Sequence, residues 1–161
     1  MILNKYILKH FTELSEAEKL MVLEWRNHND IRKWMYSSDL ITKDSHFHFI
    51  EKLKQNKENK YFIVQESKVS LGVIYFNNIN FIEKSVNIGL YVNPFFRVKG
   101  KGSILLQTAI SYAFEQLNIK KIYLEVFSKN QSARNLYNKF NFKEIKSENN
   151  IIYMELKNEN R

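Results

Sequence analysis

The segment Arg97-Val98-Lys99-Gly100-Lys101-Gly102 places three cations and two glycines between a strand-like run and a helix-like run. Small residues at a helix N-terminus leave backbone N–H groups open to an anion, and the helix dipole favours negative charge there. The segment is not a P-loop, since no Gly-Lys-Ser/Thr follows at the required spacing. It therefore indicates a phosphate site, although an ordinary glycine turn between strand and helix would explain the same residues.

A second segment, Asn130-Gln131-Ser132-Ala133-Arg134-Asn135-Leu136-Tyr137, follows about thirty residues later and leads into Phe140-Asn141-Phe142. Together the two segments resemble the Gln/Arg-x-x-Gly-x-Gly/Ala and Asn-x-x-Ala-x-x-Leu-Tyr signatures of the GNAT superfamily of N-acetyltransferases. The resemblance covers roughly residues 60–157 and implies an acetyl-CoA-dependent enzyme. One departure is Asn141, where the family has Gly, and asparagine is the next-best residue for a left-handed position after a helix.

The resemblance also implies where acetyl-CoA binds. The strand that contains Gly89 would pair with the pantetheine arm, and the backbone N–H groups at the glycine turn would hold the pyrophosphate. Asn130 would contact coenzyme A and cap its helix. The cofactor-binding residues expected on this basis are Leu90, Tyr91, Val92, Arg97, Val98, Lys99, Gly100, Lys101, Gly102, Ser103 and Asn130.

Two side chains are expected to move protons in this family's reaction. Acetyl transfer to an amine expels a thiolate, and the phenol of Tyr137 would protonate it as general acid. The competing interpretation is a core residue on the apolar face of its helix. Glu125 would accept a proton from the amine, and partial burial on its strand would raise its pKa. A solvent-facing strand carboxylate explains Glu125 nearly as well.

The N-terminal third resembles the N-acetyltransferases of bacterial pseudaminic acid biosynthesis, a pathway that serves flagellin glycosylation. The match is in Trp25-Arg26-Asn27, Trp34-Met35-Tyr36 and the His-x-x-Phe-Ile that starts at His46. Those enzymes acetylate the 4-amino group of UDP-4-amino-4,6-dideoxy-N-acetyl-β-L-altrosamine. The resemblance implies that Arg26, helped by His46, binds the diphosphate. Phe49 or Tyr36 would stack on uracil, and Met35 and Trp34 would cover the 6-methyl group.

Other interpretations stay open at this point. The aromatic residues of the N-terminal third lie at helical spacings and could be core, and Nα-acetyltransferases of ribosomal proteins share a similar Trp-Arg-Asn opening. A catalytically silent coenzyme A-binding domain could use the same fold. Nucleic-acid binding is suggested by the pI near 9.5, but no helix shows a clustered Arg/Lys stripe.

The elements that must position these residues follow from hydrophobic periodicity and capping signals. Ser15 and Glu18 form a capping box, and Thr42 can cap a later helix. Gly89 inside a strand suggests a bulge or a close approach to the backbone. The fold class predicted is α/β (α+β): one domain over residues 1–161, with a mixed sheet flanked by helices. We expect strands over residues 6–11, 61–65, 69–76, 85–92 and 122–127 and a hairpin over 142–156, with helices over 15–27, 30–36, from 43, 103–117 and 130–140.

The composition excludes several classes of protein. The 161 residues contain no cysteine, so disulfides and thiolate chemistry are absent, and the four histidines do not suggest a metal site. No apolar run approaches the ~20 residues of a membrane span, and the N-terminus does not look like a signal peptide. We therefore expect a cytoplasmic protein without a membrane or nucleic-acid partner, and a homodimer stays open. The net charge of +8 suits polyanionic ligands such as acetyl-CoA and a nucleotide sugar.

Overall fold

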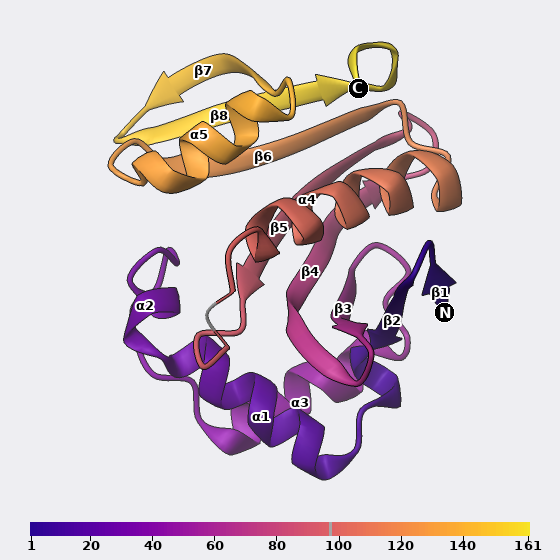
Figure 1. Ribbon diagram of the computed structural model, residues 1–161, viewed down its shortest axis with the longest axis vertical. Coiled ribbons are helices and arrows are strands. Elements are labelled where there is room, and N and C mark those ends of the chain that lie inside the picture. Colours follow the sequence, from indigo (N-terminus) through magenta and orange to yellow (C-terminus); the bar gives the residue numbers. More distant parts are fainter. Residues whose placement is uncertain (97) are drawn as a thin grey trace.

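The computed structural model describes residues 1–96 and 98–161, and Figure 1 shows a twisted sheet with helices packed against it. Eight strands of the described residues form one sheet in the order β1-β2-β3-β4-β5-β6-β8-β7. Every neighbouring pair is antiparallel except β5 with β6, so the sheet is mixed, as predicted. The strands are β1 (Ile2–Leu3), β2 (Tyr6–His10), β3 (Lys60–Glu66), β4 (Val69–Asn80), β5 (Ser85–Val92), β6 (Lys121–Phe127), β7 (Lys143–Glu148) and β8 (Ile151–Lys157).

The helices begin where the capping signals predict. Ser15 and Glu18 make the expected capping box, Thr42 accepts from the backbone of Ser45, and Asn130 accepts from that of Ala133. The helix predicted from residue 103 begins slightly earlier and ends in a π-helical turn over Tyr112–Gln116. The helices are α1 (Glu16–Asn27), α2 (Asn29–Arg32), α3 (Lys43–Leu53), α4 (Lys101–Ser111) and α5 (Gln131–Lys139), with 3-10 turns at Phe11–Glu13 and Asn158–Asn160.

The prediction of a helix over residues 30–36 is wrong in its extent, because α2 ends at Arg32. The segment from 33 to 42 is irregular and is held by side chains instead. The Asn27 amide donates to the carbonyl oxygen of Ile41 at 2.9 Å and accepts from its N–H at 2.8 Å. Arg32 donates to the carbonyl oxygen of Ser38 at 2.9 Å. These bonds fix a loop that carries several of the predicted substrate residues.

Two apolar clusters lie on opposite faces of the sheet. Helices α4 and α5 contribute to one cluster with Leu105, Leu106 and Tyr137. Helices α1, α2 and α3 contribute to the other with Trp25, Ile31 and Ile50. In Figure 1, α4 crosses in front of β4 and β5, and α1 and α3 lie at the opposite end from α5. The two faces of the sheet are therefore covered by different helices.

The sheet opens in its middle. Strands β5 and β6 pair in parallel only from Ser85 to Asn87, opposite Lys121 to Tyr123, and then diverge. Gly89 lies in the diverging part of β5, where its partner across β4 is Tyr75. A Cβ on Gly89 would lie 2.0 Å from Cζ of Tyr75, so the close approach predicted at this glycine is confirmed. Beyond Asn87 the edge of β5 is therefore no longer paired with β6.

No helix within the two described ranges combines the length and the apolar character that crossing a membrane requires. The same residues contain no cluster of three or more histidine or acidic side chains that could hold a metal ion.

Candidate active site

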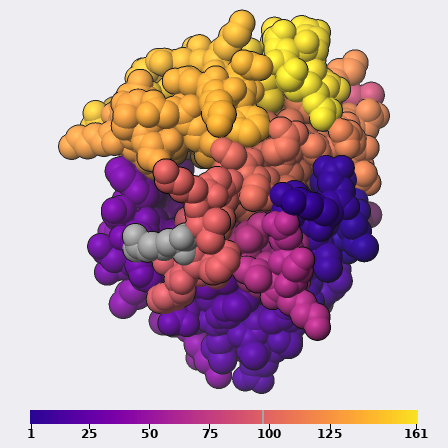
Figure 2. Space-filling view, in the orientation of Figure 1, coloured from indigo at the N-terminus to yellow at the C-terminus, as the bar shows by residue number. Residues whose placement is uncertain are grey.

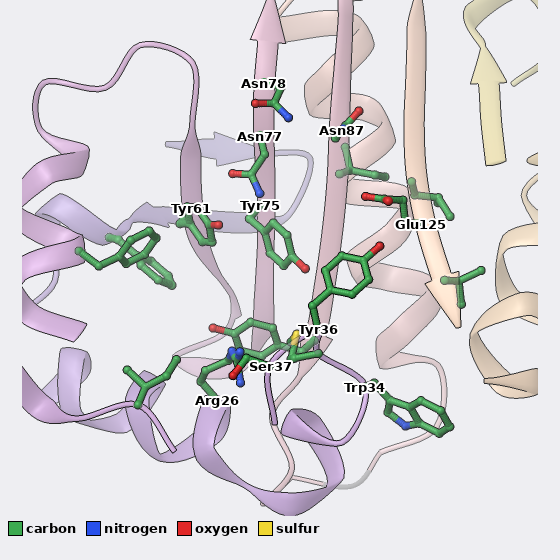
Figure 3. A pocket seen from close by; sticks show the side chains of 18 of the residues that line it. Arg26, Trp34, Tyr36, Ser37, Tyr61, Tyr75, Asn77, Asn78, Asn87 and Glu125 are labelled. Atoms are coloured by element: carbon green, nitrogen blue, oxygen red, sulfur yellow. The ribbon is translucent and has the colours of Figure 1, made fainter. Parts of the chain in front are cut away.

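A cavity of about 580 Å³ lies between the sheet and the loop that follows α2 (Figure 3). Strands β3 to β6 form its floor, and α1, α3 and the loop form its other walls. All six residues predicted to contact the acceptor substrate line this cavity: Arg26, Trp34, Met35, Tyr36, His46 and Phe49. The structure therefore brings together side chains that are separated by up to 23 positions in the sequence.

Arg26 supplies the positive charge of this cavity. Its Nη1 atom is buried and has no hydrogen-bond partner among residues 1–96 and 98–161. Figure 3 shows the guanidinium at the base of the pocket, next to Ser37. A buried guanidinium N–H without a partner costs free energy, so this atom is well placed to receive an anionic ligand.

His46 is buried and uses one ring nitrogen structurally. Its Nε2 lies 2.8 Å from the carbonyl oxygen of Lys19, to which it donates. Burial lowers the pKa of His46, so the ring is neutral near pH 7. The expectation that His46 helps Arg26 to bind a diphosphate is therefore not supported, because a neutral ring with Nε2 occupied offers only an acceptor.

The sequence reasoning missed the polar and aromatic residues on the cavity floor. Tyr61 and Tyr75 stack with ring centroids 5.0 Å apart, and Phe49 meets Tyr61 edge-on at 5.0 Å. Asparagine amides add hydrogen-bonding groups at the far end, where Tyr61 bonds to one of them. Strand alternation could have indicated part of this face, since Tyr75 and Asn77 are spaced by two along β4. The missed lining residues include Tyr61, Tyr75, Asn77, Asn78 and Asn87.

A second cavity of about 530 Å³ follows the opening between β5 and β6 and reaches α4 and α5. Figure 2 shows the surface hollowed where the gold α5 region meets the coral start of α4. Seven of the residues predicted to bind the cofactor line it: Leu90, Tyr91, Val92, Gly100, Gly102, Ser103 and Asn130. Two segments separated in sequence, the glycine turn and the start of α5, thus face the same cleft.

The glycine turn borders a further hollow of about 420 Å³, lined by Val98, Lys99, Gly100, Lys101 and Gly102. Gly100 is the N-cap of α4 and has φ 87°, which favours glycine, and it offers no side chain to cap the helix. Lys101 is buried, and its Nζ donates to the carbonyl oxygen of Asn93 at 3.0 Å. Its predicted contact with a pyrophosphate therefore rests on its backbone N–H. Arg97, also predicted to bind the cofactor, lies outside the described residues.

Tyr137 lines the second cavity from α5. Its side chain is 8% exposed and packs edge-on against Phe142 at 5.9 Å. Burial raises the pKa of Tyr137 to about 12, so its hydroxyl is protonated at neutral pH. The residue is thus both part of the core and a neutral proton donor at the cleft.

Glu125 on β6 lines both cavities. Leu124 and Val126 on either side of it are buried in the core, as the alternation of side chains along a strand requires. The predicted partial burial of Glu125 is wrong, because Glu125 is exposed. The carboxylate reaches the open cavity, where the hydroxyl of Tyr36 points towards it (Figure 3). Desolvation and the hydrogen bond with Glu125 raise the pKa of Tyr36.

The two cavities meet at shared residues, among them Tyr75, Tyr91 and Glu125. A ligand in the first cavity can therefore meet one in the second at the point where β5 and β6 separate. This arrangement suits the transfer of a group between two bound molecules, with a carboxylate on one side and a phenol on the other.

Comparison with known proteins decides the family. The sequence matches the acetyltransferase (GNAT) family over residues 12–142. Acetyltransferase PseH of Campylobacter jejuni subsp. jejuni (serotype O:23/36, strain 81-176) is 40% identical over 135 residues, 84% of this chain and 83% of that protein. The chain belongs to the GNAT family. The GNAT fold and an acetyl-CoA-dependent acetyltransferase activity, both predicted from the two signatures, are confirmed.

Solved GNAT structures agree with this fold. The crystal structure of Campylobacter jejuni N-acetyltransferase PseH in complex with acetyl coenzyme A has a TM-score of 0.79 at 33% identity, covering 95% of this chain and 99% of that one. A spermidine N-acetyltransferase from Vibrio cholerae, in complex with CoA and spermine, has a TM-score of 0.87. Its identity is only 21%, over 98% of each chain, so that likeness concerns the fold alone.

A substitution at the glycine turn tests where this GNAT chain holds the pyrophosphate. A Cβ on Gly102 would lie 3.3 Å from Leu136 of α5, so Gly102→Val crowds the cleft and covers the first N–H groups of α4. We expect acetyl-CoA binding to weaken by about tenfold or more, equivalent to ~1.4 kcal/mol, in isothermal calorimetry. The exposed turn variant Ser67→Ala serves as control, and equal affinities in both variants would contradict this placement.

Proposed function

We propose that this acetyltransferase acetylates the 4-amino group of a UDP-linked 4-amino-4,6-dideoxy sugar, UDP-4-amino-4,6-dideoxy-N-acetyl-β-L-altrosamine, in pseudaminic acid biosynthesis. The similarity to PseH of Campylobacter jejuni supports this acceptor. The observation that carries the proposal is the buried Nη1 of Arg26 in the acceptor cavity, which has no hydrogen-bond partner in the part of the chain that the structure describes. A diphosphate would give this N–H its partner, since guanidinium groups bind phosphate oxygens in a bidentate manner.

The remaining walls of the cavity suit the other parts of such a substrate. Met35, Trp34 and Phe49 offer apolar surface for a 6-methyl group or a base, and 38% of Trp34 and of Phe49 is exposed. The asparagine amides at the far end supply donors and acceptors for sugar or uracil groups. Such a mixture of apolar walls and few polar groups is typical of a small-molecule site.

A polyamine acceptor fits this cavity poorly. Of the described residues that line it, Glu125 is the one carboxylate, and Arg26 adds a positive charge. A polycation such as spermidine would need several carboxylates to offset the cost of its desolvation. An Nα-acetyltransferase of ribosomal proteins remains the alternative, because a peptide N-terminus carries only a single charge.

The proposed reaction is direct transfer from acetyl-CoA to the amine. Glu125 first takes a proton from the ammonium group, directly or through water, and the amine nitrogen attacks the acetyl carbon. The C–N bond forms, the C–S bond breaks, and the electron pair left on sulfur takes the proton of Tyr137. The new amide nitrogen loses its second proton, which restores Tyr137. Leu90 to Val92 would hold the pantetheine arm, and the N–H groups of Val98 to Ser103 the pyrophosphate.

Inhibition by free UDP tests the acceptor. We expect UDP to compete with the acceptor substrate and not with acetyl-CoA, because the diphosphate site at Arg26 is separate from the glycine turn. Initial rates of coenzyme A release, measured over a matrix of UDP and substrate concentrations, give the inhibition pattern. Absence of inhibition at millimolar UDP, with turnover of short peptides, would refute the amino-sugar acceptor and leave the acetyltransferase activity intact.

A cytoplasmic location and a homodimeric assembly stay predictions.

A further inference from the structure

Tyr75 occupies the point where the two cavities meet. It projects from β4 and lines both the acceptor cavity and the cofactor cleft. The register of β4 with β5 places it opposite Gly89, and a Cβ there would lie 2.2 Å from the Tyr75 hydroxyl oxygen. The phenol therefore lies across the backbone of β5, two residues beyond the point where β5 leaves β6.

The Tyr75 ring is fixed, and its hydroxyl is available. Tyr61 stacks on the ring at 5.0 Å with an interplanar angle of 10°, and Tyr91 lies at 6.4 Å on the other side. Within residues 1–96 and 98–161, the structure gives the hydroxyl no hydrogen-bond partner. Figure 3 shows it pointing into the pocket towards Tyr36. Burial raises the pKa of Tyr75, with smaller effects from Tyr61 and Tyr137, so the group remains a neutral donor.

Acetyl transfer builds charge on three atoms. In the proposed mechanism, Glu125 accepts a proton from the amine nitrogen and Tyr137 donates a proton to the sulfur. The third atom is the carbonyl oxygen, which becomes an oxyanion when the C–N bond forms, and preorganised donors at such an oxygen are often the largest catalytic contribution. With the pantetheine arm along Leu90 to Val92, as proposed above, the acetyl group would reach β5 near Gly89, beside the Tyr75 hydroxyl.

We propose that Tyr75 is a further catalytic residue, whose hydroxyl donates a hydrogen bond to the acetyl carbonyl oxygen and stabilises the oxyanion during transfer. The phenol keeps its proton throughout, so no further acid or base is needed. Gly89 is required in this arrangement because any side chain there would displace the phenol. The inference rests on the acetyl-CoA cleft of the proposed function and holds for any acceptor amine.

The infrared band of the thioester carbonyl tests the contact directly. Acetyl-CoA labelled with ¹³C at the carbonyl is bound to the wild type, to Tyr75→Phe and to Tyr61→Phe, without an acceptor. We expect the wild type and Tyr61→Phe to shift the carbonyl stretch to lower frequency, and Tyr75→Phe to return it towards the value of free acetyl-CoA. Tyr61→Phe is the matched control, since it removes a hydroxyl from the same stack one strand further away.

Kinetics test the catalytic half of the proposal. Loss of one oxyanion donor typically costs about 10²–10³-fold, so kcat of Tyr75→Phe should fall by at least about tenfold with unchanged affinity for coenzyme A. An identical carbonyl band in the wild type and Tyr75→Phe overturns the contact, whatever the rate. If the band of Tyr75→Phe differs from that of the wild type but its kcat stays within about threefold of the wild-type value, the catalytic role is overturned. Failure of the UDP-sugar acceptor would leave the infrared result unaffected, so the two proposals fail separately.

Discussion

Tyr137→Phe is expected to lower kcat by about 10²–10⁴-fold, the usual contribution of a general acid. The substitution removes a single hydroxyl from a side chain that is 8% exposed and keeps the ring contact with Phe142. Folding and acetyl-CoA affinity should therefore persist, while the thiolate must leave without a proton. Steady-state kinetics with saturating acetyl-CoA, together with calorimetry of acetyl-CoA binding, separate these effects.

The pH profile gives this prediction a sign. Burial raises the pKa of Tyr137 to about 12, so its hydroxyl keeps its proton over any ordinary assay range. Deprotonation of Tyr137 therefore does not lower the rate of the wild type below that pH. The defect of Tyr137→Phe should therefore be constant from pH 6 to about pH 9. Tyr112→Phe is the matched control, since that tyrosine is also buried but packs against Phe62 and Phe76 away from both cavities. Equal kcat values for the two variants would return Tyr137 to a purely structural role.

Arg26→Ala is expected to lower kcat/KM for the UDP-sugar by about tenfold to a hundredfold. A hydrogen bond to a charged group contributes ~1.5–3 kcal/mol, and the diphosphate would lose at least one such bond. The slow hydrolysis of acetyl-CoA should be unaffected, because Arg26 lines the acceptor cavity and not the cofactor cleft. UDP should also lose its inhibitory effect in this variant.

Two further variants separate the effect of the positive charge of Arg26 from the effects of its planar geometry and of its position in the cavity. Arg26→Lys keeps the positive charge but loses the planar fork, so it should recover only part of the loss. Arg161→Ala removes an arginine that pairs with Glu115 at 2.9 Å and lines neither cavity, and its kcat/KM should match the wild type. An Arg26→Ala enzyme with normal kcat/KM for the UDP-sugar would contradict a diphosphate site at this residue.

The features predicted well from the sequence are those fixed by local interactions. Ser15, Thr42 and Asn130 cap their helices because a short polar side chain reaches the backbone two or three residues ahead. Asn141 adopts φ 71°, the left-handed conformation expected where the family has glycine. The strands over β3 to β6 follow β-branched and aromatic runs in the same way.

The features missed depend on contacts between distant segments. The meeting of Tyr75 with Gly89 requires the register of β4 with β5, which no local pattern specifies. Lys101 looked like a phosphate-binding cation, but its ammonium group meets the carbonyl of Asn93 instead. The exposure of Glu125 depends on the open cavity beside β6, so strand alternation predicted its face but not its burial.

A side-by-side transfer assay tests the central claim most directly. Coenzyme A release and product mass are measured with UDP-4-amino-4,6-dideoxy-N-acetyl-β-L-altrosamine, with short N-terminal peptides and with spermidine. We predict acetylation of the nucleotide sugar, with a gain of one acetyl group and a kcat/KM about a hundredfold or more above the other amines. The buried Nη1 of Arg26, which has no hydrogen-bond partner within the described residues, discriminates against acceptors that lack a diphosphate. Preferential acetylation of peptides or spermidine, with no product from the nucleotide sugar, would contradict it.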